Sequence, residues 1–272
     1  MKNWKFYNHA AVPTTAPHEK VDLTAIKDGS IWKMPGKPLL ARWTSDFDCG
    51  YQTNWWYVIK DTSFDISALK AKRRYEISKG KKNFTVKEIN PEKYADDLYL
   101  ITVNAYSQWP EKYRPHVNET DFKRDVSGWR SCVVIGGFDA ENEQLCGYAI
   151  LREKKDYAEF SSLRVNPDAE KKAINAAIVA GILEKYSDRL ETGFYINDGS
   201  RAIRHETAFQ DYLEKYFGFR KAYCRLHIKY HFPFGLAVKL IYPFRNSINR
   251  DSSIGSLISG VLQMEEIHRS CR

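Results

Sequence analysis

The sequence predicts an α/β (α+β) fold in which a mixed central sheet is flanked by helices. Between residues 84 and 230, short runs rich in β-branched and aromatic residues alternate with segments whose apolar residues recur at helical spacing. Helix starts and stops punctuate the same region. Asn90 and Asn166 each precede a proline, which pairs an N-cap residue with proline in the first turn, and Gly218 can adopt the positive φ that ends a helix.

Composition and charge bound the class of protein. The chain has 272 residues, of which 43% are apolar, enough for one large core or two modest ones. Its net charge of +8 favours anionic partners such as phosphorylated cofactors, nucleic acid or an anionic membrane face, although the charges are interspersed as on an ordinary solvated surface. The five cysteines form no C-x-x-C pair, which argues against a disulfide framework or zinc module and favours a reducing, cytoplasmic compartment.

No segment resembles a signal peptide, and no apolar run approaches the roughly 18 residues of a membrane span. The longest apolar segment is 232–244, which carries Lys239 and two prolines. We expect it to pack against the sheet, with peripheral contact with a membrane surface as the alternative.

Residues 1–83 are expected to form an N-terminal extension or small domain. Scattered prolines in 1–40 indicate loops and short edge strands, and 55–59 reads as a strand. Trp43, Trp55, Trp56 and Tyr57 could line an acceptor groove or pack in a core. A helix is expected over 65–79 with Gly80 as its stop. Its basic residues could contact phosphates or form a solvated face: Lys70, Lys72, Arg73, Arg74, Lys79, Lys81 and Lys82.

A second domain is expected over 84–245, followed by a C-terminal amphipathic helix within 246–272. Apolar alternation predicts strands over 84–89, 132–138, 145–153, 157–165, 192–196 and 219–230. Helical spacing and end signals predict helices over 90–108, 119–129, 168–187 and about 203–217.

A polar cluster follows the strand expected at 192–196. It comprises Asp198, Gly199, Ser200, Arg201 and His205. Open α/β sheets bind ligands outside the carboxyl ends of their strands, so this cluster is a candidate site, and a capped surface loop is the alternative. A hydrolase triad is rejected because no G-x-S-x-G elbow is present, and the spacing of a zincin motif is absent.

Over residues 84–230 the order of elements resembles the GNAT family of acyltransferases. The segment SLRVNP (162–167) resembles the end of the family's fourth strand, and AFQDYLEKYFGFR (208–220) resembles its later helix and strand start, with about two extra residues. The resemblance implies splayed fourth and fifth strands that accept the pantetheine arm of acetyl-CoA or another acyl-CoA, and no metal. It places Arg164, Val165, Lys171, Lys172 and Asn175 at the cofactor.

The family's diphosphate loop, Q/R-x-x-G-x-G/A, is replaced here by residues 170–175 without either glycine. Lys171 and Lys172 would supply compensating charge, whereas Glu170 would repel a diphosphate.

The resemblance also implies roles for individual side chains. Tyr212 would protonate the leaving thiolate, and His205 would orient the acceptor or act as a base. Glu159 would act as a base for an incoming amine if burial raises its pKa. Asp198, Arg201 and Trp56 would bind the acceptor. The alternative for each is an ordinary strand-end or helix-surface residue.

The resemblance implies transfer of an acyl group, with acetyl as the favoured one, to an amine or hydroxyl of a polar acceptor. The acceptor would be a small molecule or a glycan precursor of the cell envelope. Two alternatives stay open. The segments WWYVI and ALKAKRRYEISKG resemble Fem-type aminoacyltransferases, which would imply aminoacyl-tRNA as donor. The other alternative is a degenerate GNAT fold that binds a ligand or protein without catalysis.

Overall fold

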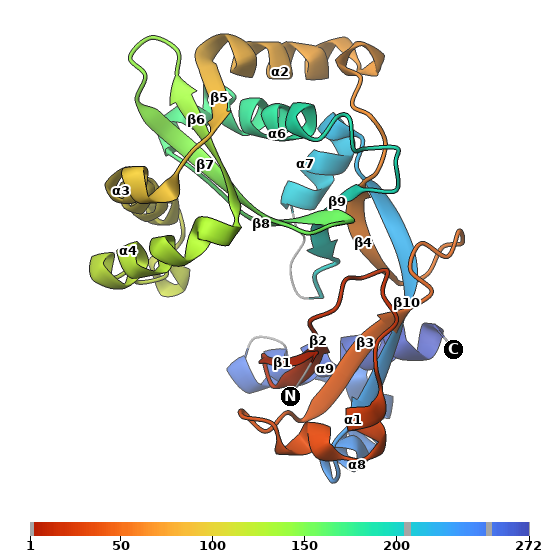
Figure 1. Ribbon diagram of the computed structural model, residues 1–272. Helices are drawn as coiled ribbons and strands as arrows, with labels where there is room; N and C mark the ends of the chain where they lie inside the picture. The colour runs from red at the N-terminus through yellow and green to blue at the C-terminus, as the bar shows by residue number, and fades with distance from the viewer. Residues whose placement is uncertain (1–2, 204–207, 249–251, 272) are drawn as a thin grey trace. The chain divides into compact units, whose positions relative to one another are not determined.

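The computed structural model describes residues 3–203, 208–248 and 252–271, which fall into two compact units (Figure 1). The first comprises Met1–Val58, Ser200–Thr207 and Lys221–Arg272, and the second comprises Ile59–Gly199 and Ala208–Arg220. This division by contacts differs from the boundaries expected after residues 83 and 245, which remain predictions about independent folding domains.

The second unit is built around a sheet of five strands. Its strands, in spatial order, are β9 (Tyr195–Ser200), β8 (Tyr157–Val165), β7 (Leu145–Glu153), β6 (Val133–Asp139) and β5 (Phe84–Glu88). Neighbouring strands from β5 to β8 are antiparallel, and β8 and β9 are parallel. The sheet is therefore mixed, as the sequence predicted.

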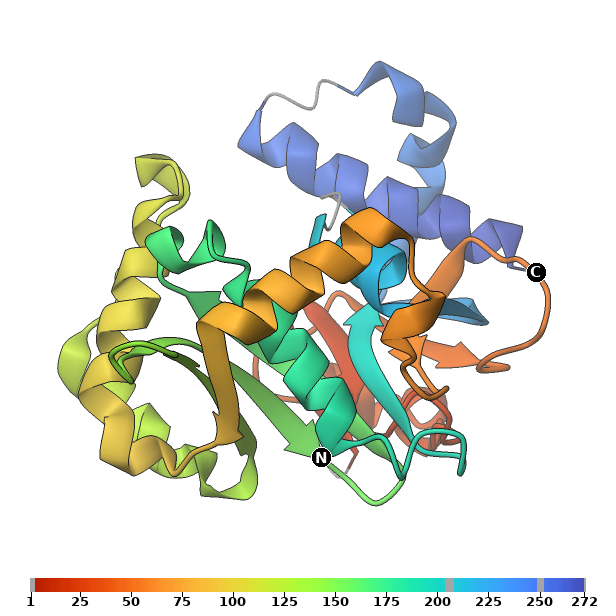
Figure 2. The same ribbon diagram turned by 90° about the horizontal axis from the view of Figure 1, so that it is seen from above.

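Helices cover both faces of this sheet (Figure 2). Helices α2 (Ala71–Asn83) and α6 (Ile174–Lys185) lie on one face, and helices α3 (Ala95–Ser107) and α4 (Glu119–Ser127) lie on the other. Alternation along β6 explains this: Val134 and Phe138 enter the core beneath α3 and α4, whereas Gly137 faces Ile178 of α6. A further helix, α7 (Ala208–Phe217), precedes β10 (Arg220–Tyr230).

The expected helix over 65–79 is displaced, and Gly80 does not end it. A short 3₁₀ turn (Ile66–Ala68) precedes α2, which runs through Gly80 to Asn83. A Cβ on Gly80 would lie 2.5 Å from the Ala173 oxygen and 2.9 Å from the Ala177 nitrogen. The glycine therefore permits close contact between α2 and the start of α6, a tertiary requirement that local sequence does not reveal.

Two further expected elements are corrected. The helix expected over 168–187 is two helices, α5 (Pro167–Glu170) and α6, because Ala173 adopts a left-handed conformation with φ 68°. The strand expected over 192–196 lies later, at Tyr195–Ser200, so Asn197 to Ser200 are strand residues rather than a loop. Parallel pairing with β8 accounts for Tyr195–Asn197, and the strand continues beyond that pairing to Ser200.

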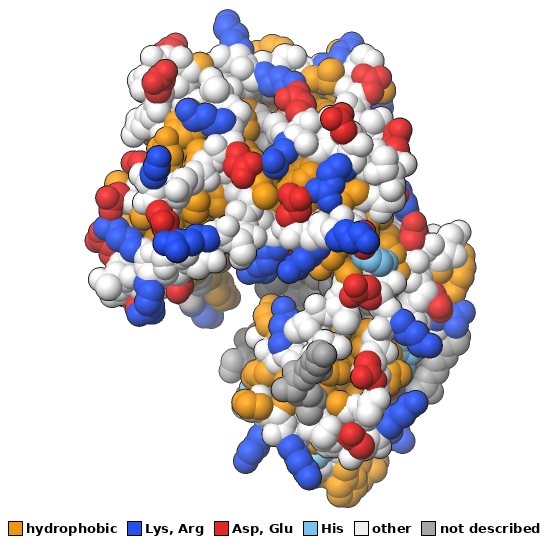
Figure 3. Space-filling view, viewed as in Figure 1, with side chains coloured by type: hydrophobic (Ala, Val, Ile, Leu, Met, Phe, Trp, Pro, Cys, Tyr) orange, Lys and Arg blue, Asp and Glu red, His pale blue; other side chains and the backbone are white. Residues whose placement is uncertain are grey.

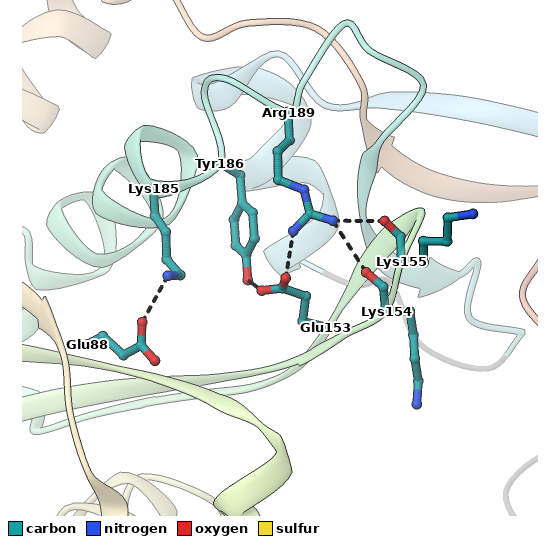
Figure 4. A network of polar contacts seen from close by, with 7 residues as sticks. All are labelled: Glu88, Glu153, Lys154, Lys155, Lys185, Tyr186 and Arg189. Atoms are coloured by element: carbon teal, nitrogen blue, oxygen red, sulfur yellow. Dashed lines mark hydrogen bonds and ion pairs between the residues drawn. The ribbon is translucent and has the colours of Figure 1, made fainter.

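A polar network ties the turn between β7 and β8 to the end of α6 (Figure 4). Glu153 accepts hydrogen bonds from the Tyr186 hydroxyl at 2.8 Å and from Arg189 at 2.6 Å. The Arg189 guanidinium also donates to the carbonyl oxygens of Lys154 and Lys155. Although burial opposes ionisation, these hydrogen bonds hold the pKa of Glu153 below its usual value.

The first unit has its own strands and helices. In spatial order its strands are β1 (Trp4–Tyr7), β2 (Ala10–Pro13), β3 (Leu40–Ser45), β10 and β4 (Trp55–Lys60). Its helices are α1 (Thr24–Lys27), α8 (Phe234–Ile241) and α9 (Ser253–Ser270). Trp55 packs in one core cluster with Leu226 of β10 and Ile267 of α9. Of the two roles expected for Trp55, packing in a core is therefore the one observed, and lining a groove is not.

The segment 232–244 does not bury its apolar residues as expected. Val238 is buried, but Phe232, Leu240 and Phe244 are each at least 65% exposed. Within the described ranges, no helix is both long and apolar enough to cross a membrane.

Candidate functional site

The site is created where β8 and β9 diverge. The two strands pair over only three residues each, Tyr157–Glu159 with Tyr195–Asn197, whereas β8 continues to pair with β7 as far as Val165. Beyond Glu159, one backbone edge of β8 is therefore open to a ligand, since a strand edge presents unpaired N–H and C=O groups.

A pocket of about 500 Å³ lies at this divergence, within the second unit. It is lined by the ends of α3 and β8, by α5 and the start of α6, and by one residue each of β9 and α7. These residues are Ala105, Tyr106, Gln108, Trp109, Phe160, Ser161, Ser162, Leu163, Arg164, Val165, Pro167, Glu170, Asn175, Asp198 and Phe209. The pocket lining therefore combines aromatic side chains with one arginine and two carboxyl groups.

Arg164 is held in place by the end of α3. Its Nη2 donates to the Tyr106 hydroxyl at 3.0 Å, and its guanidinium carbon lies 5.0 Å from the Tyr106 ring centroid. Its Nη1 donates to the Leu163 carbonyl oxygen at 2.8 Å. The arginine is therefore a positioned cation at the pocket, with donors fixed by neutral partners.

Asp198 is the titratable group best suited to proton transfer in the pocket. Burial raises its pKa from 3.8 to about 7, and a hydrogen bond with Gln210 of α7 opposes that rise. The adjacent backbone turns sharply, because Gly199 has φ +99° and donates its N–H to the Asn197 side-chain oxygen at 2.9 Å. A carboxyl group with a pKa near neutrality can accept or donate a proton under ordinary conditions.

Comparison with solved structures agrees with this architecture. The chain is similar to L-PGS from Bacillus licheniformis, with a TM-score of 0.52 and 11% identity over 89% of this chain and 84% of that chain. The fold is GNAT-like.

Two more matches have lower TM-scores. The C-terminal domain of a protein assigned as a lysylphosphatidylglycerol synthetase from Agrobacterium fabrum has a TM-score of 0.49 and 12% identity, over 87% of this chain and 82% of that chain. The PaiA N-acetyltransferase from Thermoplasma acidophilum, in complex with coenzyme A, has a TM-score of 0.31 and 14% identity, over 39% of this chain and 72% of that chain. At these identities the likeness concerns the fold alone. No protein-family profile and no curated protein matches the sequence.

The GNAT-like fold implies a coenzyme A diphosphate at the turn before α6, and the residues there do not fit that group. Lys171 pairs with Asp168 at 3.3 Å, and Lys172 pairs with Asp139 at 3.0 Å. The N–H groups of Lys172 and Ala173 donate back into their own turn, to the oxygens of Ala169 and Glu170. Both lysine charges are therefore matched by carboxylates, and Glu170 adds a negative charge at the pocket itself.

The structure brings together four of the residues expected at the site. Arg164, Val165, Asn175 and Asp198 all line the pocket. Lys171 and Lys172 line a neighbouring polar depression instead, together with Asp139 and Asn166.

The other expected catalytic residues lie elsewhere or are not described. Tyr212 stacks with Phe209 and Tyr216 in an aromatic cluster, where burial raises its pKa, and it does not line the pocket. Glu159 lies 3.8 Å from Arg152 and also lies outside the lining. His205 falls outside the described residues. The roles of these three residues remain predictions.

Arg201 and Trp56 come together in the first unit. The Arg201 guanidinium carbon lies 4.4 Å from the Trp56 ring centroid, and its backbone N–H donates to the Trp56 oxygen at 3.0 Å. Lys221 lies 4.8 Å from the same ring. Burial lowers the pKa of Arg201. This pair of cations on an indole suits an anionic or π-rich ligand group.

Sequence reasoning missed the aromatic walls of the pocket. Tyr106 lies in the last turn of α3 and Trp109 follows it, whereas Phe160 and Phe209 come from different elements. The run of aromatics around 106–109 was a visible signal, but only the packing of α3 beside β8 shows that it faces the pocket.

Proposed function

We propose that this chain is an acyltransferase that moves an acyl group onto an amine or hydroxyl of a polar acceptor at the divergence of β8 and β9. One observation carries the proposal: the open edge of β8 and the carboxyl group of Asp198, with its pKa of about 7, line the same pocket. Acyl transfer needs both features, because a carbonyl must be polarised and a proton must leave the nucleophile.

The chemistry follows from these two groups. Backbone N–H groups on the open edge of β8 would hydrogen-bond the carbonyl oxygen of the donor and stabilise the negative charge that develops on it. The Asp198 carboxylate would take the proton of the attacking nitrogen or oxygen as its lone pair bonds to the carbonyl carbon. The bond to the leaving group then breaks, and the proton held by Asp198 is available to that group.

The donor favoured by the local charges is an aminoacyl ester of tRNA rather than an acyl-CoA. The turn before α6 holds carboxylates where a diphosphate would need cations, as described above. In contrast, residues 70–82 contain seven lysines and arginines and one glutamate. The α2 residue Lys79 donates to the Lys171 oxygen at 2.6 Å, so the end of this basic helix adjoins the turn. A basic helix beside an acyl site suits a polyanionic carrier.

For the acceptor, the aromatic wall formed by Trp109, Phe160 and Phe209 supports a ring-bearing polar molecule such as a glycan precursor. We propose the cytoplasm as the compartment, which is supported by five cysteines that are all free of disulfides.

Two measurements test the donor. The first is calorimetric titration with acetyl-CoA and with CoA, for which we expect no binding at millimolar cofactor. The second is binding of bulk tRNA at about 50 and 500 mM salt, for which we expect tight binding that high salt abolishes. Charge reversal of Lys72 and Lys82 should weaken tRNA binding at least tenfold, whereas reversal of the exposed Lys93 and Lys154 should not.

Transfer itself is tested with bulk tRNA charged with radiolabelled amino acids and an amine-bearing acceptor set. Label that moves to the acceptor in the wild type and not in Asp198→Asn would support the proposal. Micromolar binding of acetyl-CoA would replace the tRNA donor with acyl-CoA. Failure of both donors to give any product would overturn the acyltransferase assignment itself.

A further inference from the structure

An exposed apolar stripe runs along α8 and the turns on either side of it. Phe232, Leu236, Leu240 and Phe244 recur every four residues and are 78%, 53%, 65% and 65% exposed. Only Val238 of α8, 4% exposed, is buried in the core of the first unit. Exposed large apolar residues are common singly, but four within 13 residues of one short segment mark a candidate interaction surface.

The charged side chains of the segment itself are all positive. The sequence contains no aspartate or glutamate between Glu214 and Asp251, whereas Lys229, Lys239 and Arg245 lie in or beside the segment. Two glutamates of α9 that lie near the segment are paired. Glu265 pairs with Arg269 at 2.7 Å and accepts from Tyr230, and Glu266 pairs with Arg245 at 3.4 Å.

At the end of the first unit where α8 lies, hydrophobic side chains form the tip, and lysine, arginine and acidic side chains lie above it (Figure 3). Arg269 and Arg245 also lie over the ring of Tyr242, at 3.8 and 4.6 Å from its centroid, which places aromatic and cationic groups together at the margin of the stripe.

We propose that α8 and its flanking turns, residues 232–245, dock this protein on the surface of an anionic lipid bilayer. Apolar side chains would enter the boundary between headgroups and acyl chains, while Lys229, Lys239 and Arg245 would contact anionic headgroups. The core of a protein–protein interface is depleted in lysine, whereas an interfacial membrane helix is rich in it on its polar side. The positive charge of the segment therefore favours a bilayer over a protein groove.

The test is flotation of the full-length protein with two kinds of vesicle, phosphatidylcholine alone and phosphatidylcholine with about 30% phosphatidylglycerol. At about 0.1 M salt we expect binding to the phosphatidylglycerol-containing vesicles and at least tenfold weaker binding to phosphatidylcholine alone. At about 0.5 M salt much of the binding should be lost, because the Debye length shortens. The double variant Leu240→Ser, Phe244→Ser should lose at least tenfold in binding to the anionic vesicles.

A matched control removes equally exposed aromatic residues from the second unit. The double variant Tyr75→Ser, Tyr113→Ser alters side chains that are 68% and 65% exposed and should bind like the wild type. Circular dichroism and thermal unfolding must show that both variants are folded. Lys239→Glu provides a second folded test, since it should weaken binding without removing any apolar contact.

Three outcomes overturn the proposal. The first is a wild type that does not float with the anionic vesicles. The second is binding that the stripe variant retains in full. The third is a wild type that forms a dimer, disrupted by Leu240→Ser, Phe244→Ser, and does not bind vesicles, which would make the stripe a protein interface.

Discussion

Arg164 and Tyr106 join the open strand edge to the end of α3 through a 3.0 Å hydrogen bond, with the guanidinium 5.0 Å from the phenol ring centroid. The two residues are 58 positions apart in the chain. Their contact places a cation at the mouth of the pocket without neutralising it, because the partners are a hydroxyl, a carbonyl oxygen and a ring. An anionic or strongly polar group of the donor or acceptor can therefore bind there.

Substitution of Arg164 should damage transfer more than stability. We expect Arg164→Ala to lower kcat/KM at least tenfold, because a bidentate cation is lost from the pocket, and Arg164→Lys to recover little of it. Tyr106→Phe keeps the ring and removes only the hydroxyl, so its effect should be a few-fold. Steady-state kinetics with a thermal unfolding control check this, and an unchanged kcat/KM in Arg164→Ala would place the arginine outside the reaction.

Asp198→Asn should stabilise the protein at alkaline pH although it slows the reaction. The folded pKa of about 7 exceeds the usual 3.8, so the folded state binds the proton more tightly and the wild type loses stability as pH rises from about 4 to 7. At pH 8 the variant should be more stable by up to about 4 kcal/mol, and at pH 3.5 the two should be equal. Urea unfolding at the two pH values measures this difference.

The same carboxyl group sets the expected pH dependence of the rate. If Asp198 is the base, kcat/KM should rise with pH through about 7 and then level off, and Asp198→Asn should be slower by about 10²–10⁴-fold. A wild-type profile that is flat from pH 6 to 8 would argue for another base.

Gly80→Ala should destabilise the protein although alanine is the better helix former. The helix propensity of alanine favours it by about 1 kcal/mol, but the new methyl group would meet the Ala173 oxygen at 2.5 Å. Forced separation of α2 from α6 should cost about 1–3 kcal/mol. Urea unfolding compares it with Ser78→Ala, an exposed change on the same helix that should be neutral or slightly stabilising; equal behaviour of the two variants would show that the helices separate freely.

Glu153→Gln should weaken the tie between the turn after β7 and the end of α6. The pKa of Glu153 is lowered in the folded state, so its contribution is present above the usual value of 4.5 and is lost as pH falls below it. Because the pair is about one-third exposed, we expect a loss of about 1 kcal/mol at pH 7 and none near pH 3. The exposed Glu111→Gln should show no such pH-dependent loss, and a constant difference at both pH values would exclude the ionised pair as its cause.

Much of the fold follows from local pattern. The strands expected over 145–153 and 157–165 are confirmed as Leu145–Glu153 and Tyr157–Val165, because alternating apolar residues bounded by polar turns leave little choice. Gly218 ends α7 with φ +66°, as its position before Phe219 predicted. Errors occurred where a distant partner decides the conformation, as at Gly80 in α2 and at the polar residues of β9.

The sequence by itself determined the order of strands and helices, the GNAT-like class and the absence of the glycines of the diphosphate loop before α6, because each depends on residues close together in the chain. The tertiary structure alone decided that Asp198 is half-buried beside an open strand edge, that Tyr106 fixes Arg164, and that the α8 stripe faces outward. Burial, pKa and strand pairing depend on side chains brought together from distant positions, and composition or periodicity within one segment does not contain that information.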